Sequence, residues 1–339
     1  MRILLSHCMH ADPELEAGVA ADRAEIVVQR GLPGAYEPVA ETLRAAIDGI
    51  VHYPGNTEVD GGPDAYPQVR ALLRSGVGFD GLDIEAWGRR GVAVFNVPDY
   101  GTSEVADHAL ALMLTLTRGI ATYHEAMRAD AAGRWYEVAV PCVKRLRGAV
   151  FGIVGLGRIG LAAAMRARGF GMRIAFYDPY LASGMEIAVG AERCTSLAEL
   201  FAMSDVVSLH LPANRETRNM IGAEILRAAK PGLVLVNTAR GTIVDLEALY
   251  DALKGGRIAG AALDVLPEEP PRGRNRLLEA FANREPWLDG RLTLSPHAAF
   301  YSPDALRDMR VKGVETVIRH LATGDLTNCV NREYLVRRE

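Results

Sequence analysis

Late in the chain, a histidine and a pair of acids are of types that suit proton transfer. His297 follows an apolar run at residues 292–294, and Glu268 and Glu269 follow another at residues 260–263. Histidine gives and takes protons near neutral pH, and a carboxylate bonded to its ring stabilises the charged form. The residues leave open whether Glu268 or Glu269 orients His297, or whether the acids form an ordinary loop around a structural histidine.

Arg240 adds a group that binds anions. It follows an apolar run at residues 233–237 and precedes Gly241. Its planar guanidinium can contact a carboxylate and a neighbouring ketone oxygen together. The plainer alternative is a surface arginine in a loop.

A glycine-rich turn between a predicted strand and a predicted helix indicates a dinucleotide site. The strand covers residues 149–154, and the helix extends to about residue 168. Gly155 permits the tight turn, Gly157 lets the backbone approach a pyrophosphate, and Gly160 lets the helix pack against the strand. The free N–H groups at the start of the helix favour phosphates.

An acid at the end of the next predicted strand strengthens this interpretation. The strand covers residues 173–177 and ends before Asp178, at about the 20-residue distance typical of dinucleotide sites. The carboxylate would accept hydrogen bonds from ribose hydroxyls and repel a 2′-phosphate, which favours NAD over NADP. The alternative is a turn residue before Pro179.

Composition sets the class of protein. A length of 339 residues suggests two domains, and 49% hydrophobic with 24% charged residues is ordinary for a globular protein. The net charge of −4 gives no general support for a nucleic-acid partner, and no apolar run is long enough to span a membrane. We expect a cytoplasmic enzyme with free thiols and no metal site, because the cysteines are scattered: Cys8, Cys142, Cys194 and Cys329.

Alternating strand and helix patterns predict an α/β fold with parallel sheets. The first part should contain helices at residues 39–46 and 84–90 and strands at residues 2–5, 25–29, 49–52, 71–73 and 92–95. The second part should contain the strands 149–154, 173–177, 206–209, 233–237, 260–263 and 292–294. Ser196, with Glu199 three residues later, and Asp245 are predicted helix caps.

Two long helical patterns define the predicted domains. A helix at residues 101–127 should lead into the dinucleotide domain, and a helix at residues 302–323 should return to complete the first domain. We therefore expect a discontinuous substrate domain, 1–98 plus 298–339, and an inserted dinucleotide domain, 99–297.

Residues 270–287 are predicted to form a long, charged surface loop. A solvated insertion is the simpler interpretation. The other is that its arginines attract a polyanionic substrate, such as a phosphate- or phosphonate-bearing keto acid; these are Arg272, Arg274, Arg276 and Arg284.

Over nearly its whole length the chain resembles the D-2-hydroxyacid dehydrogenase family. The motifs are the turn at residues 155–160, Leu209-His210-Leu211-Pro212, Asn237-Thr238-Ala239-Arg240-Gly241, Gly260-Ala261-Ala262-Leu263-Asp264, Glu269-Pro270 and Ser295-Pro296-His297. A closer resemblance is to the C-terminal-binding-protein branch, which includes animal NADH-sensing corepressors and bacterial dehydrogenases. It is carried by Phe176-Tyr177-Asp178-Pro179-Tyr180-Leu181, by residues 296–302 and by Asn328-Cys329-Val330-Asn331.

The resemblance implies two Rossmann-like domains, the substrate domain being flavodoxin-like, and a catalytic set. Arg240 would polarise the keto group and bind the carboxylate, His297 would be the general acid/base, and Glu269, by its motif position, would hold His297. Cofactor contacts are implied for Gly155, Leu156, Gly157, Arg158, Ile159, Gly160, Asp178, Pro179, Leu211, Pro212, Thr217, Thr238, Ala239, Arg240, Asp264 and His297. Substrate contacts are implied for His52, Arg74, Gly76, Val77, Gly78, Arg240, His297 and Phe300, the last replacing a tryptophan of the animal corepressors.

The expected activity is NAD-dependent interconversion of a small-molecule 2-keto acid and a D-2-hydroxy acid. The alternative is an NADH-sensing, corepressor-like binding protein with vestigial activity. The chain stops at Glu339, soon after the returning helix, without the long tail of the corepressors, which favours the enzyme. The resemblance also implies a homodimer, with the apolar helix at residues 101–127 as its expected interface.

Overall fold

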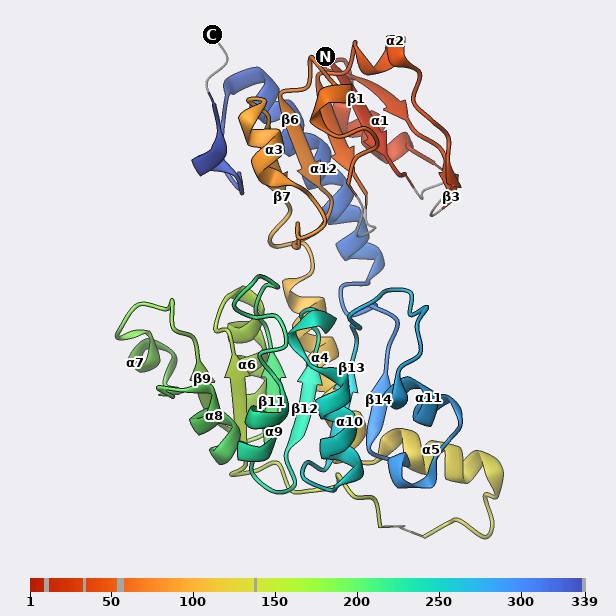
Figure 1. Ribbon diagram of the computed structural model, residues 1–339, viewed down its shortest axis with the longest axis vertical. Helices are drawn as coiled ribbons and strands as arrows, with labels where there is room; N and C mark the ends of the chain where they lie inside the picture. The colour runs from red at the N-terminus through yellow and green to blue at the C-terminus, as the bar shows by residue number, and fades with distance from the viewer. Residues whose placement is uncertain (9–11, 33–34, 54–57, 137–138, 337–339) are drawn as a thin grey trace. The chain divides into compact units, whose positions relative to one another are not determined.

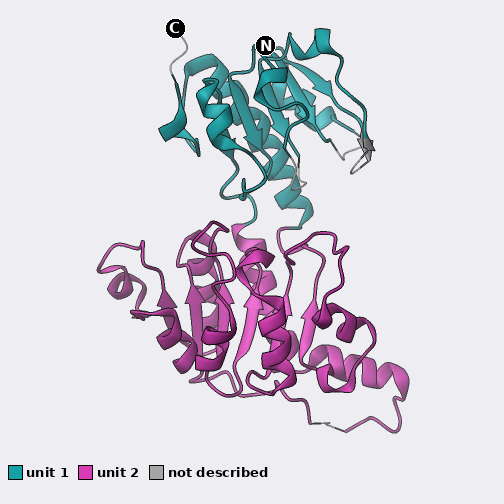
Figure 2. Ribbon diagram, viewed as in Figure 1, with its two compact units in different colours: residues 1–101, 301–339 teal, residues 102–300 magenta. Residues whose placement is uncertain are grey.

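The computed structural model describes residues 1–8, 12–32, 35–53, 58–136 and 139–336. The chain divides into two compact units (Figure 2). Unit 1 comprises Met1–Gly101 and Tyr301–Glu339, and unit 2 comprises Thr102–Phe300. The predicted domain boundaries, residues 98 and 298, lie a few residues before these divisions.

Unit 1 is built on a parallel five-stranded sheet in the order β2-β1-β5-β6-β7 (Figure 1). The strands β5, β6 and β7 are buried along their whole length, and each is apolar up to its last residue, which is polar. The strands are β1 (Arg2–Ser6), β2 (Glu25–Val28), β5 (Gly49–His52), β6 (Ala71–Arg74) and β7 (Ala93–Asn96), with a short antiparallel pair, β3 (Gly31–Leu32) and β4 (Ala35–Tyr36).

A helix from the end of the chain completes unit 1. The predicted helix at residues 302–323 is confirmed as α12 (Pro303–Thr323), with Ser302 as its N-cap. It approaches the sheet closely: a Cβ on Gly49 would lie 2.5 Å from Val317. The other helices of this unit are α1 (Glu14–Ala20), α2 (Glu41–Arg44), α3 (Ile84–Arg89) and the 3₁₀ turns η1 (Pro63–Ala65) and η4 (Arg332–Tyr334).

Unit 2 is a doubly wound parallel sheet, as predicted, in the order β10-β9-β8-β11-β12-β13-β14. Helices cover both faces, and each face has its own apolar core. The strands are β8 (Val150–Val154), β9 (Arg173–Tyr177), β10 (Glu192–Arg193), β11 (Val206–Leu209), β12 (Val234–Asn237), β13 (Gly260–Leu263) and β14 (Leu292–Leu294). The helices include α6 (Arg158–Gly169), α7 (Met185–Val189), α8 (Leu197–Met203), α9 (Ala223–Ala228), α10 (Leu246–Lys254) and the 3₁₀ turn η2 (Gly241–Ile243).

The predicted caps lie where expected. The Ser196 hydroxyl accepts the N–H of Glu199 at 3.1 Å and starts α8. Asp245 accepts the N–H groups of Glu247 and Ala248 at the start of α10.

The single helix predicted at residues 101–127 is wrong. The chain forms α4 (Thr102–Thr117) and α5 (Ile120–Ala129), broken at Gly119, whose φ of 67° takes the backbone out of the helix. The apolar side chains of α4, including Ala109 and Met113, lie in the core of unit 2. That apolar surface is therefore covered within unit 2, and the homodimer interface at residues 101–127 stays a prediction.

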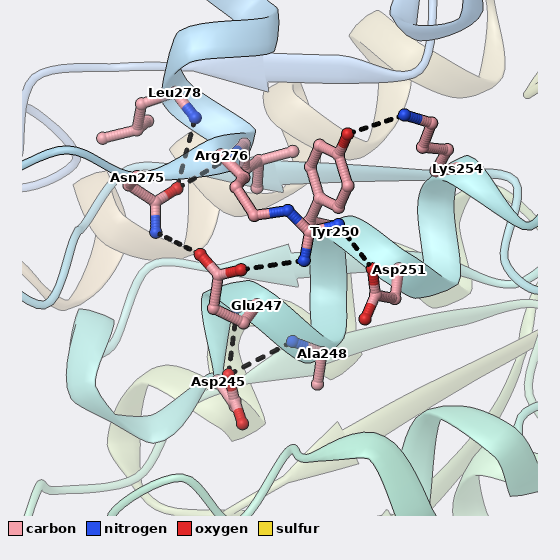
Figure 3. Close-up of polar contacts among 10 residues, drawn as sticks. Asp245, Glu247, Ala248, Tyr250, Asp251, Lys254, Asn275, Arg276 and Leu278 are labelled. Carbon is pink, nitrogen blue, oxygen red and sulfur yellow. Dashed lines mark hydrogen bonds and ion pairs between the residues drawn. The ribbon is translucent and has the colours of Figure 1, made fainter.

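The prediction of a loop at residues 270–287 is also wrong in part. The stretch contains α11 (Arg276–Ala282) and the 3₁₀ turn η3 (Pro286–Leu288). Asn275 caps α11 by accepting the N–H groups of Leu277 and Leu278 (Figure 3). Leu277 and Ala280 are buried beneath it, so this arginine-rich stretch includes a short amphipathic helix.

The four cysteines are free thiols, as predicted. In the part of the chain that the structure describes, no helix has both the length and the apolar character to cross a membrane.

Candidate active site

The turn between β8 and α6 requires two of its three glycines for steric reasons. Gly155 has a φ of 86°, and a Cβ there would lie 2.6 Å from the carbonyl oxygen of His210. A Cβ on Gly160 would lie 2.2 Å from the carbonyl oxygen of Gly155. At Gly157, by contrast, a Cβ would meet nothing within 4 Å, so open space lies over the start of α6.

Asp178 is held over this turn. One carboxylate oxygen accepts the N–H of Leu156 and the other accepts the N–H of Tyr180, each at 3.0 Å. The acid therefore lies next to the glycine turn, as a ribose-binding acid must.

Two further groups lie at the carboxyl ends of neighbouring strands. Thr217 orders the loop after β11, because its hydroxyl donates to the carbonyl of Pro212 at 2.8 Å. After β12, the Thr238 hydroxyl is buried and has no hydrogen-bond partner among the described residues. A buried hydroxyl without a hydrogen bond costs folding free energy, so the Thr238 hydroxyl is available to bond a ligand at this edge of the sheet. The open turn, Asp178 and Thr238 together fit a dinucleotide.

The Arg240 turn is braced by Asn237. The side-chain oxygen of Asn237 accepts the N–H of Ala239, and its nitrogen donates to the carbonyl of Arg240, both at 3.0 Å. Next to it, a Cβ on Gly241 would lie 1.9 Å from the carbonyl carbon of Leu266. The turns after β12 and β13 are therefore in direct backbone contact.

The turn after β13 carries Glu269, and the structure distinguishes it from Glu268. Glu269 Oε2 lies 2.6 Å from His297 Nδ1, and Oε1 accepts the N–H of Leu266 at 2.8 Å. Glu268 instead faces the N–H groups of Arg272 and Gly273. Because a carboxylate only accepts, Nδ1 of His297 carries a proton, and Nε2 is the atom left to exchange protons with a ligand. The side chain of His297 is 41% exposed, so a ligand can reach it.

The backbone at His297 is held in an unusual conformation. Its φ of 52° is left-handed, which is uncommon for a residue with a side chain. Its N–H donates to the carbonyl of Asp264, and the carboxylate of Asp264 accepts the N–H groups of Ala298 and Ala299 at 2.9 and 3.0 Å. The Phe300 ring lies edge-on to the His297 ring, with centroids 6.3 Å apart.

Asp264 was predicted only as a cofactor contact, and its place under the His297 turn was missed. It is 2% exposed and also accepts the Ser295 hydroxyl at 2.6 Å. His108 on α4, likewise missed, lies 3.0 Å from Ser295. The sequence does carry one indication of His108, since it is a polar residue within an apolar helical pattern.

In unit 1, the predicted substrate residues also lie at the carboxyl ends of parallel strands. Ser6, His52, Arg74 and Asn96 are partners in register across four strands, and all four are buried. Asn96 donates to the carbonyl of Val77 at 2.7 Å and so orders the loop that contains Gly76 and Gly78.

Other polar residues at this edge were not predicted. Gln29 accepts the Ser6 hydroxyl at 3.1 Å and donates to Asp60 at 2.8 Å, while His7 stacks on Tyr36 with ring centroids 4.1 Å apart. Ser75 is also buried, and its hydroxyl has no hydrogen-bond partner among the described residues. They were missed because each of them lies outside a motif.

The arginines of the 270–287 stretch differ in their surroundings. Arg276 lies over the Tyr250 ring at 4.0 Å and contacts Glu247 and Asp251 at 3.1 and 3.0 Å (Figure 3). It therefore fastens α11 to α10, and its charge is balanced by two acids. Arg274 lies 3.6 Å from Glu279 and is highly exposed.

Comparisons with known proteins identify the family. The NAD-binding domain model of the D-isomer specific 2-hydroxyacid dehydrogenases matches residues 110–299. A glyoxylate reductase of Korarchaeum cryptofilum is 39% identical over 273 residues, which cover 80% of this chain and 78% of that protein. C-terminal-binding protein 1 of Caenorhabditis elegans is 34% identical over 283 residues, which cover 81% of this chain but 38% of that protein.

Solved structures agree over nearly the whole length. A D-lactate dehydrogenase from Aquifex aeolicus, complexed with NAD and lactic acid, has a TM-score of 0.82 at 26% identity and covers 97% of this chain and 99% of its own. An NADPH-dependent glyoxylate/hydroxypyruvate reductase from Sinorhizobium meliloti, in complex with NADP and malonate, has a TM-score of 0.81 at 30% identity and covers 100% and 99%. The chain belongs to the D-isomer specific 2-hydroxyacid dehydrogenase family.

Proposed function

We propose that this protein reduces a small 2-keto acid to the D-2-hydroxy acid at the expense of NADH. The observation that supports this most directly is the 2.6 Å contact between His297 and Glu269, next to the turn that carries Arg240. The family supplies the reaction class, and this geometry suggests which residues perform it.

His297 is the proposed general acid. In the reductive direction, Nε2 of the protonated ring gives its proton to the keto oxygen as the carbon accepts a hydride. Glu269 stabilises the charged ring before transfer and keeps it oriented. The hydride comes from the reduced nicotinamide when the dinucleotide is bound.

Arg240 is proposed to bind the substrate carboxylate and to stabilise the negative charge that grows on the keto oxygen. In unit 1, Arg74 and the backbone N–H groups of Gly76, Val77 and Gly78 are proposed to bind the carboxylate as well. His52 is buried beside Arg74 in register and is proposed as a further substrate contact, as is Phe300.

The cofactor is proposed to be NAD. The start of α6 at Gly157 would receive the pyrophosphate, Asp178 the ribose hydroxyls, and Thr238 would gain the hydrogen-bond partner it lacks. A carboxylate at Asp178 would repel the 2′-phosphate of NADP. Asp264 has its carboxylate bonded within the protein, so we propose that its contribution to cofactor binding is indirect.

Small polar keto acids are the favoured substrates. The carboxyl edge of the unit 1 sheet carries buried polar groups, and one of them, the Ser75 hydroxyl, has no hydrogen-bond partner among the described residues, which suits a polar substrate better than a large apolar side chain. Arg276 is paired with two acids, so its charge does not support the polyanionic substrate proposed for the arginines of residues 270–287.

A second candidate is an NADH-sensing binding protein with vestigial activity. It is favoured by the similarity to C-terminal-binding protein 1, which this chain matches at 34% identity.

A homodimer is also proposed. Trp135 and Tyr136, which follow α5, are exposed and are better candidates for its interface than α4. Light scattering on the purified protein would give the mass of the assembly.

The deciding experiment follows the loss of NADH or NADPH absorbance with glyoxylate, pyruvate, hydroxypyruvate, phenylpyruvate and phosphonopyruvate, with His297→Ala as the control. We expect turnover with a small keto acid, a preference for NADH, and at least about 100-fold lower kcat in the variant, since acid–base catalysis contributes about 10²–10⁴-fold. Tight NADH binding with no turnover on any of them would favour the binding protein. Preference for NADPH would contradict the role of Asp178.

A further inference from the structure

His108 is a polar side chain on α4 that contacts Ser295 and Asp264, the residues beneath the turn that carries His297. Its Nε2 lies 3.0 Å from Ser295 Oγ and 3.5 Å from Asp264 Oδ1. Its side chain is 28% exposed, so water only partly screens these contacts. No motif that carries the proposed function includes it.

The available protons determine the direction of each hydrogen bond. The Asp264 carboxylate accepts two backbone N–H groups, one on each oxygen, and lies 2.6 Å from Ser295 Oγ. Two acceptors at that distance would repel, so the Ser295 proton points to Asp264. The Ser295 hydroxyl has no other proton, and His108 must therefore donate to its oxygen through Nε2–H.

This chain of bonds ends at the backbone around His297. The two N–H groups held by Asp264 belong to Ala298 and Ala299, directly after His297. His297 itself is left-handed, with a φ of 52°, and such a conformation persists only where its surroundings fix it. A change in the Asp264 carboxylate is therefore transmitted to the position of the imidazole.

We propose that His108 is a positioning residue for the catalytic centre, acting through Ser295 and Asp264 on the backbone that presents His297. The inference rests on the proposed function, because it assigns His108 a role in the same reaction. Among the described residues, His108 makes its polar contacts with Ser295 and Asp264 and not with the proposed catalytic partners Glu269 and Arg240. It acts only by orienting a turn.

The hydrogen bond between His108 and Ser295 lies where a buried helix can hold the turn that carries His297. Unit 2 begins at Thr102, the first residue of α4, and ends at Phe300. The hydrogen bond between His108 and Ser295 joins the segments at which the chain enters and leaves the unit. Because α4 is packed in the core, it gives the exposed catalytic turn a rigid anchor.

Three substitutions separate this role from simple loss of packing. Gln places an amide N–H near the position of Nε2, Asn places it near Nδ1, and Leu removes the donor while keeping the bulk. We expect kcat for keto-acid reduction to fall about 3- to 10-fold in His108→Leu and His108→Asn and to stay within about twofold in His108→Gln, the range expected for one hydrogen bond. The Kd of NADH, read from its fluorescence, should change less than about twofold. If Leu matches wild type, or if Gln loses as much as Leu, the proposal is wrong.

A Ser295→Ala background tests the route. There, adding His108→Leu should lower kcat by no more than about twofold, because the link is already broken. A full further fall would mean that His108 acts by another path and would overturn the inference.

One measurement does not depend on activity. Long-range proton–nitrogen NMR correlations on the histidine rings should show a proton on His108 Nε2, and the Ala298 and Ala299 amide signals should move in His108→Leu but not in His108→Gln. A His108 tautomer protonated only on Nδ1 would contradict the proposal even in an active enzyme. If instead the NMR results are as expected but no keto acid is reduced, the proposed function fails while the hydrogen-bond chain stands.

Discussion

At the scale of single residues, two adjacent glutamates have different surroundings. Glu269 contacts His297 and the N–H of Leu266, whereas Glu268 faces the exposed backbone at residues 272–273. The pair therefore contains its own control, since one carboxylate touches the proposed acid and its neighbour does not.

We expect Glu269→Gln to lower kcat/KM about 10- to 100-fold. The loss of the charged partner removes a charge-assisted hydrogen bond worth about 1.5–3 kcal/mol, and each 1.4 kcal/mol is tenfold in rate. Glu268→Gln should remain within about twofold of wild type. Steady-state kinetics on the best keto acid would decide, and equal losses in the two variants would refute the assignment of Glu269.

At the scale of elements, the site depends on how closely the turns after β12 and β13 approach. The backbone at Gly241 contacts that of Leu266 with no room for a methyl group. The turns that carry Arg240 and Glu269 can therefore approach this closely only because residue 241 has no side chain. Gly160, after β8, likewise has no room for a methyl group, which lets α6 pack against the glycine turn.

Gly241→Ala should therefore push the two turns apart. We expect kcat to fall at least about tenfold and the free energy of unfolding to drop by about 1–3 kcal/mol, as for other overpacked sites. Gly18→Ala in α1, where a Cβ meets nothing within 4 Å, is the matched control and should be neutral or stabilise by about 0.5–1 kcal/mol. Kinetics and urea unfolding of both variants provide the check; a Gly241→Ala enzyme with wild-type kcat would show that the turns adjust independently.

Sequence patterns predicted those elements whose type is set by the order of residues within one short segment. The strands β8, β9 and β11–β14, the glycine turn and the caps Ser196 and Asp245 follow from short-range patterning, and the fold class follows from their alternation. The break at Gly119 and the helix α11 were missed, because a glycine after an apolar run and an arginine-rich stretch are each compatible with several structures. The links of His108 and Asp264 span 187 and 34 residues, and no local pattern encodes such partners.

At the scale of the whole molecule, unit 1 is closed by contacts between the two ends of the chain. Glu16 on α1 is fully buried and accepts two hydrogen bonds from Arg310 on α12, at 2.7 and 2.6 Å, and a third from the Tyr53 hydroxyl. Burial by itself would raise the pKa of Glu16 above the ordinary 4.5, but the hydrogen bonds from Arg310 and Tyr53 outweigh it and lower the pKa. The native state thus binds this proton less readily than the unfolded chain does.

Stability should consequently fall as the solution becomes acidic. The contribution of Glu16 is complete above pH 4.5 and is lost as the pH falls from there through its lower native value. In urea unfolding as a function of pH, Tyr53→Phe should make this acid-side fall shallower, since the native pKa of Glu16 loses one of its lowering bonds. An unchanged slope below pH 4.5 would show that other carboxylates govern the acid transition.

The order in which the two units are completed follows from the division of the chain. Unit 2 is one continuous stretch and can fold as soon as residue 300 has left the ribosome, whereas unit 1 still lacks α12. Until then the sheet face around Val51 and Leu73, which α12 covers at Gly313, has no partner. Translation of unit 1 therefore starts before that of unit 2 but is completed after it, and a nascent chain paused before residue 303 exposes this apolar sheet face.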